Sequence, residues 1–411
     1  MDFLTANKCA FIFIPAGIFQ TFPGLYFSLP LSMHQRPMKE TPVHTSDPRA
    51  GYLALKEEID EAIRGVLNGP GYILGTTVSD LESAFARYIG TAHGIGVNNG
   101  TDAIHLALRA LGIGDGDEVI TVSHTAVATV AAIGMAGAVP VLADVDPRTR
   151  TIDPVAAEAL ITSRTKAIIA VHLYGHPADL GTLGEVCAKH GLFLVEDCAQ
   201  AHAAEWQGKK VGAFGHVSTF SFYPTKNLGA IGDAGMVLTS DDALAIKLRL
   251  LRQYGWEKPQ YSLVQGWNSR LDPLQAAILS VKLRHLDAQT GRRRVLAGTY
   301  TRQLKALPIK LPTVGAGCTH AYHLYVIELL DLSQREALRA HLAERGIIAG
   351  VHYPFGVHQQ PAYRPWIRKG PMTVTERLAE TVLSLPLYPE LSDTDQQRVC
   401  EAVRGFFTVQ R

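Results

Sequence analysis

Between about residue 52 and residue 200, short apolar runs alternate with stretches of helical periodicity. "ALKEEIDEAIRGVL" and "VSDLESAFARYIG" repeat their apolar residues with the spacing of one helix face, which predicts two helices. Later runs such as "AIIAV" and "LFLV" are apolar at every position. Such runs indicate strands that are buried on both faces. The alternation predicts an α/β fold, with a mostly parallel central sheet flanked by helices.

After Asp272 the pattern changes. "LDPLQAAILSVKLRHLDAQTGRRRVLAGTYTRQLKAL" predicts one long helix or two joined helices, "AYHLYVIELL" and "IIAGVHYP" predict strands, and "DTDQQRVCEAVRGFF" predicts a final helix. We therefore expect a large domain over residues 38–290 and a smaller C-terminal α+β domain over residues 291–411. The densest basic run, Arg292 to Arg294, is expected to form a solvated helix face.

Residues 1–37 do not share this pattern. Their apolar run "CAFIFIPAGIF" contains Pro15 and is shorter than the roughly 20 residues that span a membrane. A signal peptide is one interpretation, because Lys8 precedes the run. We favour the other, an N-terminal extension that is disordered or not native, with translation starting at Met38.

The composition narrows the class of protein. The chain has 411 residues, of which 47% are hydrophobic and 19% charged, as in ordinary globular proteins. Its formal net charge of +1 gives no overall field that would attract nucleic acid or an anionic membrane. The five cysteines form no CxxC pair, so we expect no metal site and a reducing compartment, the cytoplasm.

The motif "NNGTDAIHLAL" predicts the end of a strand, a tight turn and a helix that begins at Thr101 or Asp102. The free N–H groups and the dipole of a helix start bind anions. The Thr101 hydroxyl can add a further hydrogen bond. The alternative is that Thr101 serves only as the N-cap of the helix.

The motif "LFLVEDCAQAH" places Glu196 and Asp197 at the end of an apolar strand. Ligands of open α/β sheets bind beyond the carboxyl ends of the strands, where an acid can meet a cation. The alternative is an acid that only caps the next turn.

The motif "FSFYPTKNLGAIGDAGMV" places Lys226 after an alternating strand and a proline turn. A partly desolvated lysine has a lowered pKa and can form a Schiff base, although most lysines lie at the surface. A phosphate cradle, the Asp197 carboxylate for a cationic ring nitrogen and the Lys226 amine for an aldehyde match the three handles of pyridoxal phosphate (PLP).

On these motifs, from about Tyr52 to Phe407, the chain resembles the DegT/StrS-type aminotransferases. These are PLP enzymes of the aspartate aminotransferase fold, fold type I, that aminate keto groups of nucleotide-linked sugars. The resemblance implies that Lys226 and Asp197 are catalytic. It implies substrate binding at His352, Tyr353 and His358. The cofactor contacts that it implies are Gly100, Thr101, Asp102, Asp197, Gln200, Ser221, Lys226 and Asn268.

The resemblance also implies a homodimer with shared active sites, in which Asn268 of "GWNSRLDPLQAAIL" reaches the phosphate in the neighbouring subunit. L-glutamate is the implied amino donor. Some relatives carry histidine in place of the lysine and dehydrate sugars, so Lys226 favours transamination. One departure stands out: family members often stack an aromatic residue on the cofactor ring where this chain has Ala126. We expect His124 or another group to cover the ring, or a more open face.

Two other functions use the same motifs. A keto-cyclitol, as in aminoglycoside pathways, could replace the nucleotide-linked sugar as the substrate. A regulatory or binding protein could keep the fold without turnover, although the presence of Asp197, Ser221 and Lys226 weighs against this interpretation.

Overall fold

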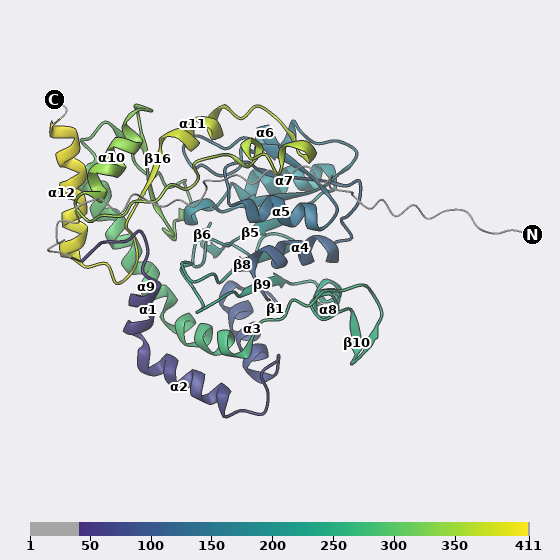
Figure 1. Ribbon diagram of the computed structural model, residues 1–411. Coiled ribbons are helices and arrows are strands. Elements are labelled where there is room, and N and C mark those ends of the chain that lie inside the picture. The colour runs from purple at the N-terminus through teal and green to yellow at the C-terminus, as the bar shows by residue number, and fades with distance from the viewer. Residues whose placement is uncertain (1–40, 410–411) are drawn as a thin grey trace, which may run out of the picture. The chain divides into compact units, whose positions relative to one another are not determined.

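The computed structural model describes residues 41–409, and the extension predicted over residues 1–37 lies outside them (Figure 1). Residues Pro42–Arg411 group into one compact unit. Within the described range, no helix combines the length and the apolar character needed to cross a bilayer.

An eight-stranded sheet lies within the larger hydrophobic core. Helices flank the sheet (Figure 1). Its strand order is β1-β9-β8-β5-β4-β2-β3-β15, and β9 alone among them runs antiparallel to its neighbours. The strands are β1 (His93–Val97), β2 (Glu118–Val122), β3 (Val139–Ala143), β4 (Thr165–Val171), β5 (Phe193–Asp197), β8 (Val217–Ser221), β9 (Gly235–Thr239) and β15 (Arg368–Lys369). The carboxyl ends of β1, β2, β4, β5 and β8 therefore meet at one edge of the sheet.

Helices alternate with these strands, so the predicted α/β class with a mostly parallel, helix-flanked sheet is confirmed. Residues 167–171 of β4 are all buried, as the continuous apolar run "AIIAV" predicts. The helices up to residue 251 are α1 (Pro48–Ala54), α2 (Lys56–Leu67), α3 (Thr76–Ile89), α4 (Gly100–Ala110), α5 (Val127–Met135), α6 (Pro154–Glu158), α7 (Leu180–His190) and α8 (Asp242–Leu251).

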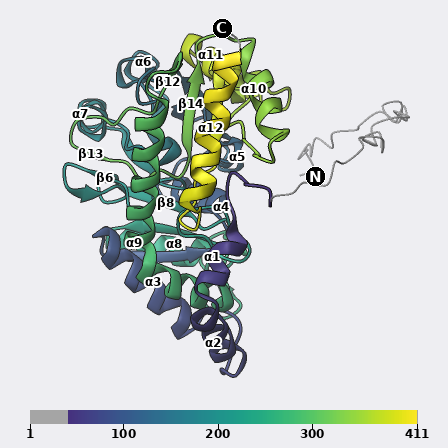
Figure 2. The ribbon, with the colours of Figure 1, turned by 90° about the vertical axis from the view of Figure 1, so that its left-hand side faces the viewer.

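A single helix, α9 (Pro273–Leu304), extends from the large sheet region to the C-terminal part. It contacts α2 and α3 along its first half and α12 (Asp393–Val409) further on (Figure 2). Its side chains enter both large hydrophobic cores, Leu279 and Leu286 in the first and Leu296 and Tyr300 in the second. The domain boundary predicted near residue 290 falls inside this helix and stays a prediction.

The second core surrounds a small antiparallel sheet, ordered β12-β14-β16. Its strands are β12 (Ile309–Lys310), β14 (Tyr325–Leu329) and β16 (Val382–Leu385), and it packs with α10 (Gln334–Ala343), α11 (Thr373–Thr381) and α12. The shorter elements are β6 (Glu205–Trp206), β7 (Lys209–Lys210), β10 (Trp256–Lys258), β11 (Tyr261–Ser262), β13 (Cys318–Thr319), η1 (Leu173–Gly175), η2 (Val357–Gln359) and η3 (Arg364–Trp366).

The strand predicted for "IIAGVHYP" is wrong. Ile347 forms an isolated bridge with Val43, and Gly350 forms another with Ser384. The two bridges go to different partners in opposite directions, so no continuous ladder can form. The segment instead crosses from one neighbour to the next, which brings the His352 carbonyl to the hydroxyl of Tyr174, three residues after the end of β4.

The solvated face predicted for the basic run is also wrong for Arg293, which is 5% exposed. Its Nη1 donates to the backbone carbonyls of Tyr322, His323 and Leu387 at 3.3, 3.4 and 2.8 Å. Irregular segments leave carbonyl oxygens without ladder partners, and these oxygens compensate the burial of the guanidinium.

Candidate active site

The predicted site residues gather where the strands of the large sheet end. Gly100 follows β1, Asp197 is the last residue of β5, and Ser221 is the last residue of β8. Lys226 follows β8 by one turn, and its N–H donates to the carbonyl of Tyr223 at 2.8 Å. The parallel direction of these strands places all of their ends on one edge, as predicted from the sequence.

The start of α4 provides an anion-binding cradle. Asn99 is the N-cap, because its side chain accepts the N–H of Asp102 at 2.8 Å. The alternative of Thr101 as N-cap is therefore wrong, and the helix begins at Gly100, ahead of the predicted start. Within residues 41–409, the N–H groups of Gly100 and Thr101 have no acceptor. Both donors remain free for a bound anion.

The lysine strand lies directly against this cradle. A Cβ atom built on Gly100 would lie 2.5 Å from Cβ of Ser221, so only glycine allows this approach. The Ser221 oxygen accepts the N–H of Tyr223 at 3.3 Å, which leaves its own hydrogen free to donate. The predicted phosphate contacts Gly100, Thr101 and Ser221 are thus neighbours in the fold.

Asp102 and Asn268 lie beside the same helix start. The hydroxyl of Ser269 donates to Oδ2 of Asp102 at 2.7 Å and accepts the N–H of Asn98 at 3.1 Å. The Asp102 side chain therefore anchors the segment that carries Asn268. Asn268 itself is exposed, and its role at a neighbouring subunit stays a prediction.

The carboxylate of Asp197 is fixed on both oxygens. Oδ2 accepts the hydroxyl of Thr129 at 2.8 Å, and Oδ1 accepts the N–H of Ala199 at 3.1 Å. Thr129 is buried in the first turn of α5, and no sequence motif singled it out. Each carboxylate oxygen can accept a further hydrogen bond, so a cationic ring nitrogen remains a suitable partner.

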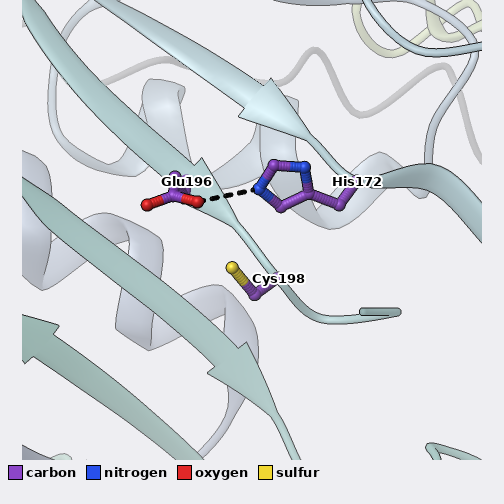
Figure 3. A group of neighbouring side chains, drawn as sticks. All are labelled: His172, Glu196 and Cys198. Carbon is purple, nitrogen blue, oxygen red and sulfur yellow. Dashed lines mark hydrogen bonds and ion pairs between the residues drawn. The ribbon is translucent and has the colours of Figure 1, made fainter. Parts of the chain in front are cut away.

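Glu196, the neighbouring acid, faces away from Asp197 because side chains alternate along a strand. It lies beside His172 and Cys198, with potential metal-ligand atoms within 4.8 Å of one another (Figure 3). The His172 ring, whose Nδ1 accepts the N–H of Ala178, donates through Nε2 to Glu196 at 3.1 Å. The carboxylate also accepts three backbone N–H groups at 2.7–2.8 Å, those of Gly212, Phe214 and Gly215. These bonds assign Glu196 to holding the chain ahead of β8.

The Lys226 amine lies in a partly desolvated environment. Burial lowers the pKa of Lys226 from 10.5 to about 8, although the negative charge of Asp197 raises it in part. Its neighbour Asn227 is buried and donates to the carbonyl of Ala321 at 3.1 Å. On the other side of the turn, Nζ of Lys282 donates to the carbonyl of Gly229 at 2.6 Å. The lysine thus projects from a loop that is fixed at both ends.

Two of the three predicted substrate residues lie near the predicted catalytic residues, His352 near Lys226 and Tyr353 near Asp197. Burial and the charge of Lys226 lower the pKa of His352 to about 4, and its Nδ1 lies 2.9 Å from Oγ of Ser384. The hydroxyl of Tyr353 accepts a hydrogen bond from Nε2 of Gln200 at 3.0 Å. Burial raises the pKa of Tyr353 to about 12, and the charge of Asp197 adds to the rise. The hydrogen bond from Gln200 lowers this pKa in part.

The third predicted substrate residue, His358, is held elsewhere. Its Nδ1 lies 2.7 Å from Oγ of Ser123, and its Nε2 lies 3.1 Å from a carboxylate oxygen of Glu376. Both ring nitrogens are therefore occupied by the protein. Its role in substrate binding stays a prediction.

No aromatic side chain stands at position 126, where family members often stack one on the cofactor ring. Ala126, the N-cap of α5, is half-buried and presents only a methyl group. His124 is fully buried, with Nε2 at 2.8 Å from the hydroxyl of Tyr174. Burial lowers the pKa of His124 to about 3, so the ring is neutral. The sequence analysis did not predict Tyr174 as a site residue. The one feature that could have indicated it is its position just after the predicted strand "AIIAV".

The helix start, the strand-end acid and the lysine all lie in a span of the chain that matches the sequence model of one protein family. Residues 53–404 match the DegT/DnrJ/EryC1/StrS aminotransferase family. The chain belongs to this family. The matched span contains every predicted site residue.

Curated relatives of this aminotransferase family match over most of their length. The chain is 46% identical over 360 residues to a "Pleiotropic regulatory protein" of Geobacillus stearothermophilus, covering 87% of this chain and 96% of the relative. It is 46% identical over 368 residues to the "dTDP-3-amino-3,4,6-trideoxy-alpha-D-glucose transaminase" of Streptomyces venezuelae, covering 89% and 96%. It is 44% identical over 366 residues to the "UDP-N-acetyl-3-dehydro-alpha-D-glucosamine 3-aminotranferase" of Acidithiobacillus ferrooxidans, covering 89% and 98%.

Solved structures agree with the predicted fold. The S. venezuelae protein DesV in complex with a ketimine intermediate superposes with a TM-score of 0.87 at 45% identity, covering 89% of this chain and 99% of that chain. NtdA of Bacillus subtilis with bound cofactor PMP superposes with a TM-score of 0.83 at 29% identity, covering 90% and 87%.

Proposed function

We propose that the protein is a PLP-dependent aminotransferase that converts the keto group at carbon 3 of a nucleotide-linked sugar to an amine. The observation that carries the proposal is the meeting of three groups at one sheet edge. These are the free N–H groups at the start of α4, the Asp197 carboxylate and the Lys226 amine.

The residues fit PLP in chemistry and in place. The N–H groups of Gly100 and Thr101 and the hydroxyl of Ser221 would hold the phosphate. Asp197 would face the ring nitrogen, and Lys226 would bind the aldehyde covalently. When bound, PLP supplies an electron sink that stabilises negative charge on the carbon being aminated.

The side chains then divide the remaining work. Lys226, with a pKa of about 8, can take up and release a proton near neutral pH, as a general base and acid must. The Thr129 and Ala199 hydrogen bonds hold Asp197 in a single orientation. His352 is neutral at pH 7 because its pKa is about 4, so the substrate meets a polar but uncharged ring.

The choice of carbon 3 rests on the relatives. The S. venezuelae and A. ferrooxidans proteins carry names that place the amino group, or the keto group, at carbon 3 of a nucleotide-linked sugar. Both align over 89% of this chain. L-glutamate is the proposed amino donor, from the same family likeness.

The similarity to the "Pleiotropic regulatory protein" favours a second candidate, a regulatory role. A protein that only binds its ligand has no need of a lysine with a pKa near 8. The retained Lys226 and Asp197 therefore favour turnover. A keto-cyclitol substrate is the third candidate.

We further propose a cytoplasmic homodimer. Tyr223 and Ile231, on either side of Lys226, expose 52% and 48% of their surface. Large apolar side chains next to a site are commonly covered by a partner surface, here a second copy. Among the described residues, Cys187, Cys198, Cys318 and Cys400 are free thiols, which suits a reducing compartment.

Transfer of a labelled amino group tests the function. The holoenzyme is incubated with ¹⁵N-glutamate and a panel of nucleotide-linked 3-keto sugars, 4-keto sugars and keto-inositols. We expect ¹⁵N at carbon 3 of a nucleotide-linked sugar. Label at carbon 4, or only in the inositols, would contradict the substrate assignment. No transfer from any amino donor to any substrate would favour the regulatory role.

A further inference from the structure

A closed ring of hydrogen bonds joins three side chains of the site. The N–H of Tyr174 donates to Oε1 of Gln200 at 2.8 Å, and Nε2 of Gln200 donates to the hydroxyl of Tyr353 at 3.0 Å. The hydroxyl of Tyr174 donates to the carbonyl of His352, the residue bonded to Tyr353. The ring thus connects the segment after β4, the acid motif and the C-terminal motif.

The direction of every bond in this ring is determined. The N–H of Tyr174 can only donate, so the Gln200 oxygen faces it and the amide nitrogen must face Tyr353. The Gln200 nitrogen can only donate, so the Tyr353 oxygen accepts. The Tyr353 hydrogen is left over, and no acceptor for it is found within residues 41–409. The hydroxyl of Tyr353 is therefore available as a donor.

Tyr174 is itself rigidly held. It is 4% exposed, and its φ of +60° is a left-handed conformation that few non-glycine residues adopt. Its carbonyl accepts the N–H of His323 at 2.9 Å. The Tyr174 hydroxyl gives its hydrogen to the His352 carbonyl. The Tyr174 oxygen must therefore accept the hydrogen bond from Nε2–H of His124, at 2.8 Å. Tyr174 therefore cannot shift without breaking bonds to several segments.

We propose that Tyr174 and Gln200 are positioning residues that hold Tyr353 with its hydroxyl hydrogen directed at the sugar substrate. The inference rests on the proposed function, because the sugar is the acceptor of that hydrogen. Gln200 Oε1 accepts from Tyr174, and one of the two N–H groups on Nε2 donates to Tyr353, so Gln200 can act on the substrate through Tyr353. Its second N–H remains for the predicted cofactor contact, which stays a prediction. Tyr174 acts one step further away, through Gln200 and through the His352 carbonyl.

Gln200→Glu tests this polarity. The new carboxylate can still accept the N–H of Tyr174, but it can no longer donate to Tyr353. The Tyr353 hydrogen then turns to the carboxylate and away from the substrate. We expect kcat/KM for the keto sugar to fall about 10- to 100-fold, the size expected for one lost hydrogen bond to a substrate.

A double-mutant cycle shows whether Gln200 affects the substrate through Tyr353 or by itself. If Gln200 works through Tyr353, Gln200→Glu costs less than about twofold when Tyr353→Phe is already present. An equal loss of kcat/KM in both backgrounds would overturn the proposal.

A second measurement does not depend on turnover. Tyr353 is replaced by 3-fluorotyrosine, and its phenol is titrated by ¹⁹F NMR in the apoenzyme. Donation from Gln200 stabilises the phenolate, so Gln200→Glu should raise the phenol pKa. An unchanged pKa would show that Gln200 does not donate to Tyr353. If the pKa rises but no keto sugar is a substrate, the proposed function fails and the positioning of Tyr353 stands.

Tyr174→Phe tests the outer residue, with Tyr300→Phe as its matched control. The buried Tyr300 hydroxyl also donates to a backbone carbonyl, that of Pro386 at 2.8 Å, in the second core. Both variants should lower the melting temperature to a similar extent. Tyr174→Phe should in addition lower kcat/KM for the keto sugar at least fivefold and shift the ¹⁹F signal at position 353. Equal values of kcat/KM in the two variants would show that Tyr174 contributes only to stability, which would contradict the proposal.

Discussion

The hydroxyl of Thr129 donates a 2.8 Å hydrogen bond to Oδ2 of Asp197. Both residues are buried, and the bond joins the first turn of α5 to the end of β5. Hydrogen bonds to a charged acceptor are stronger than neutral ones, so this contact fixes the carboxylate firmly. The acid is therefore oriented before any ligand binds.

Thr129→Val should lower kcat about tenfold, because it keeps nearly the same side-chain shape but leaves Asp197 held only by the N–H of Ala199. Thr129→Ser, which keeps the hydroxyl, should recover most of that loss. Steady-state kinetics of the two variants, with melting temperatures, check the prediction. Equal activity in both would mean that Thr129 does not orient the acid.

Asp197 and Glu196 are adjacent in sequence, but their substitution should affect different properties, activity for Asp197 and stability for Glu196. Asp197→Asn should keep the melting temperature within a few degrees and lose most activity, because the amide offers no charge to the ring nitrogen. Glu196→Gln should lower the melting temperature, since its amide nitrogen cannot accept the backbone N–H groups that the carboxylate binds. The reverse pattern, an inactive but stable Glu196→Gln, would assign the catalytic acid to Glu196.

The Lys226 amine should titrate near pH 8. Only the uncharged amine attacks an aldehyde, so the rate of covalent PLP uptake by the apoenzyme should rise with pH and level off above about 8. The charge of Asp197 raises the pKa of Lys226, so Asp197→Asn should shift this midpoint to lower pH. Stopped-flow absorbance measures the rate. A midpoint near 10.5 in the unaltered protein would contradict the burial of the amine.

Mixed dimers test whether active sites are shared. Lys226→Ala and Asn268→Asp should each be inactive, the second because it sets a negative charge against the phosphate. If Asn268 serves the neighbouring subunit, one site of each mixed dimer collects both lesions and the other is intact. Mixing should then restore activity of up to one site per mixed dimer. With subunit exchange confirmed by mass spectrometry, no recovery would mean that Asn268 serves its own subunit.

The sequence predicted the groups that lie within one motif at a strand end. Asp197 and Lys226 could be placed because an apolar strand precedes each motif, and the carboxyl ends of parallel strands meet at one edge. The sequence could not decide whether Thr101 is the N-cap, because "NNGTD" offers several capping residues. The backbone angles of Asn99 and its bond to the N–H of Asp102 exclude that alternative.

Contacts between distant segments could not be predicted in this way. The partners of Thr129 and Arg293 lie 29 to 94 residues away along the chain. Hydrophobic periodicity shows that a helix is present but not which carbonyls lie beside it. The buried role of Arg293 depends on irregular segments, whose paths follow from packing and not from local pattern.

The proposed chemistry depends on Lys226, so the most direct measurement is its covalent label. The holoenzyme is reduced with borohydride, digested and mapped by mass spectrometry. We predict that the pyridoxyl group lies on Lys226. Lys282, whose amine lies beside the same loop at 2.6 Å from the Gly229 carbonyl, is an internal control and should stay unmodified. A pyridoxyl group on Lys282 or on any other lysine, or an active holoenzyme that yields no label, would contradict this account of the site.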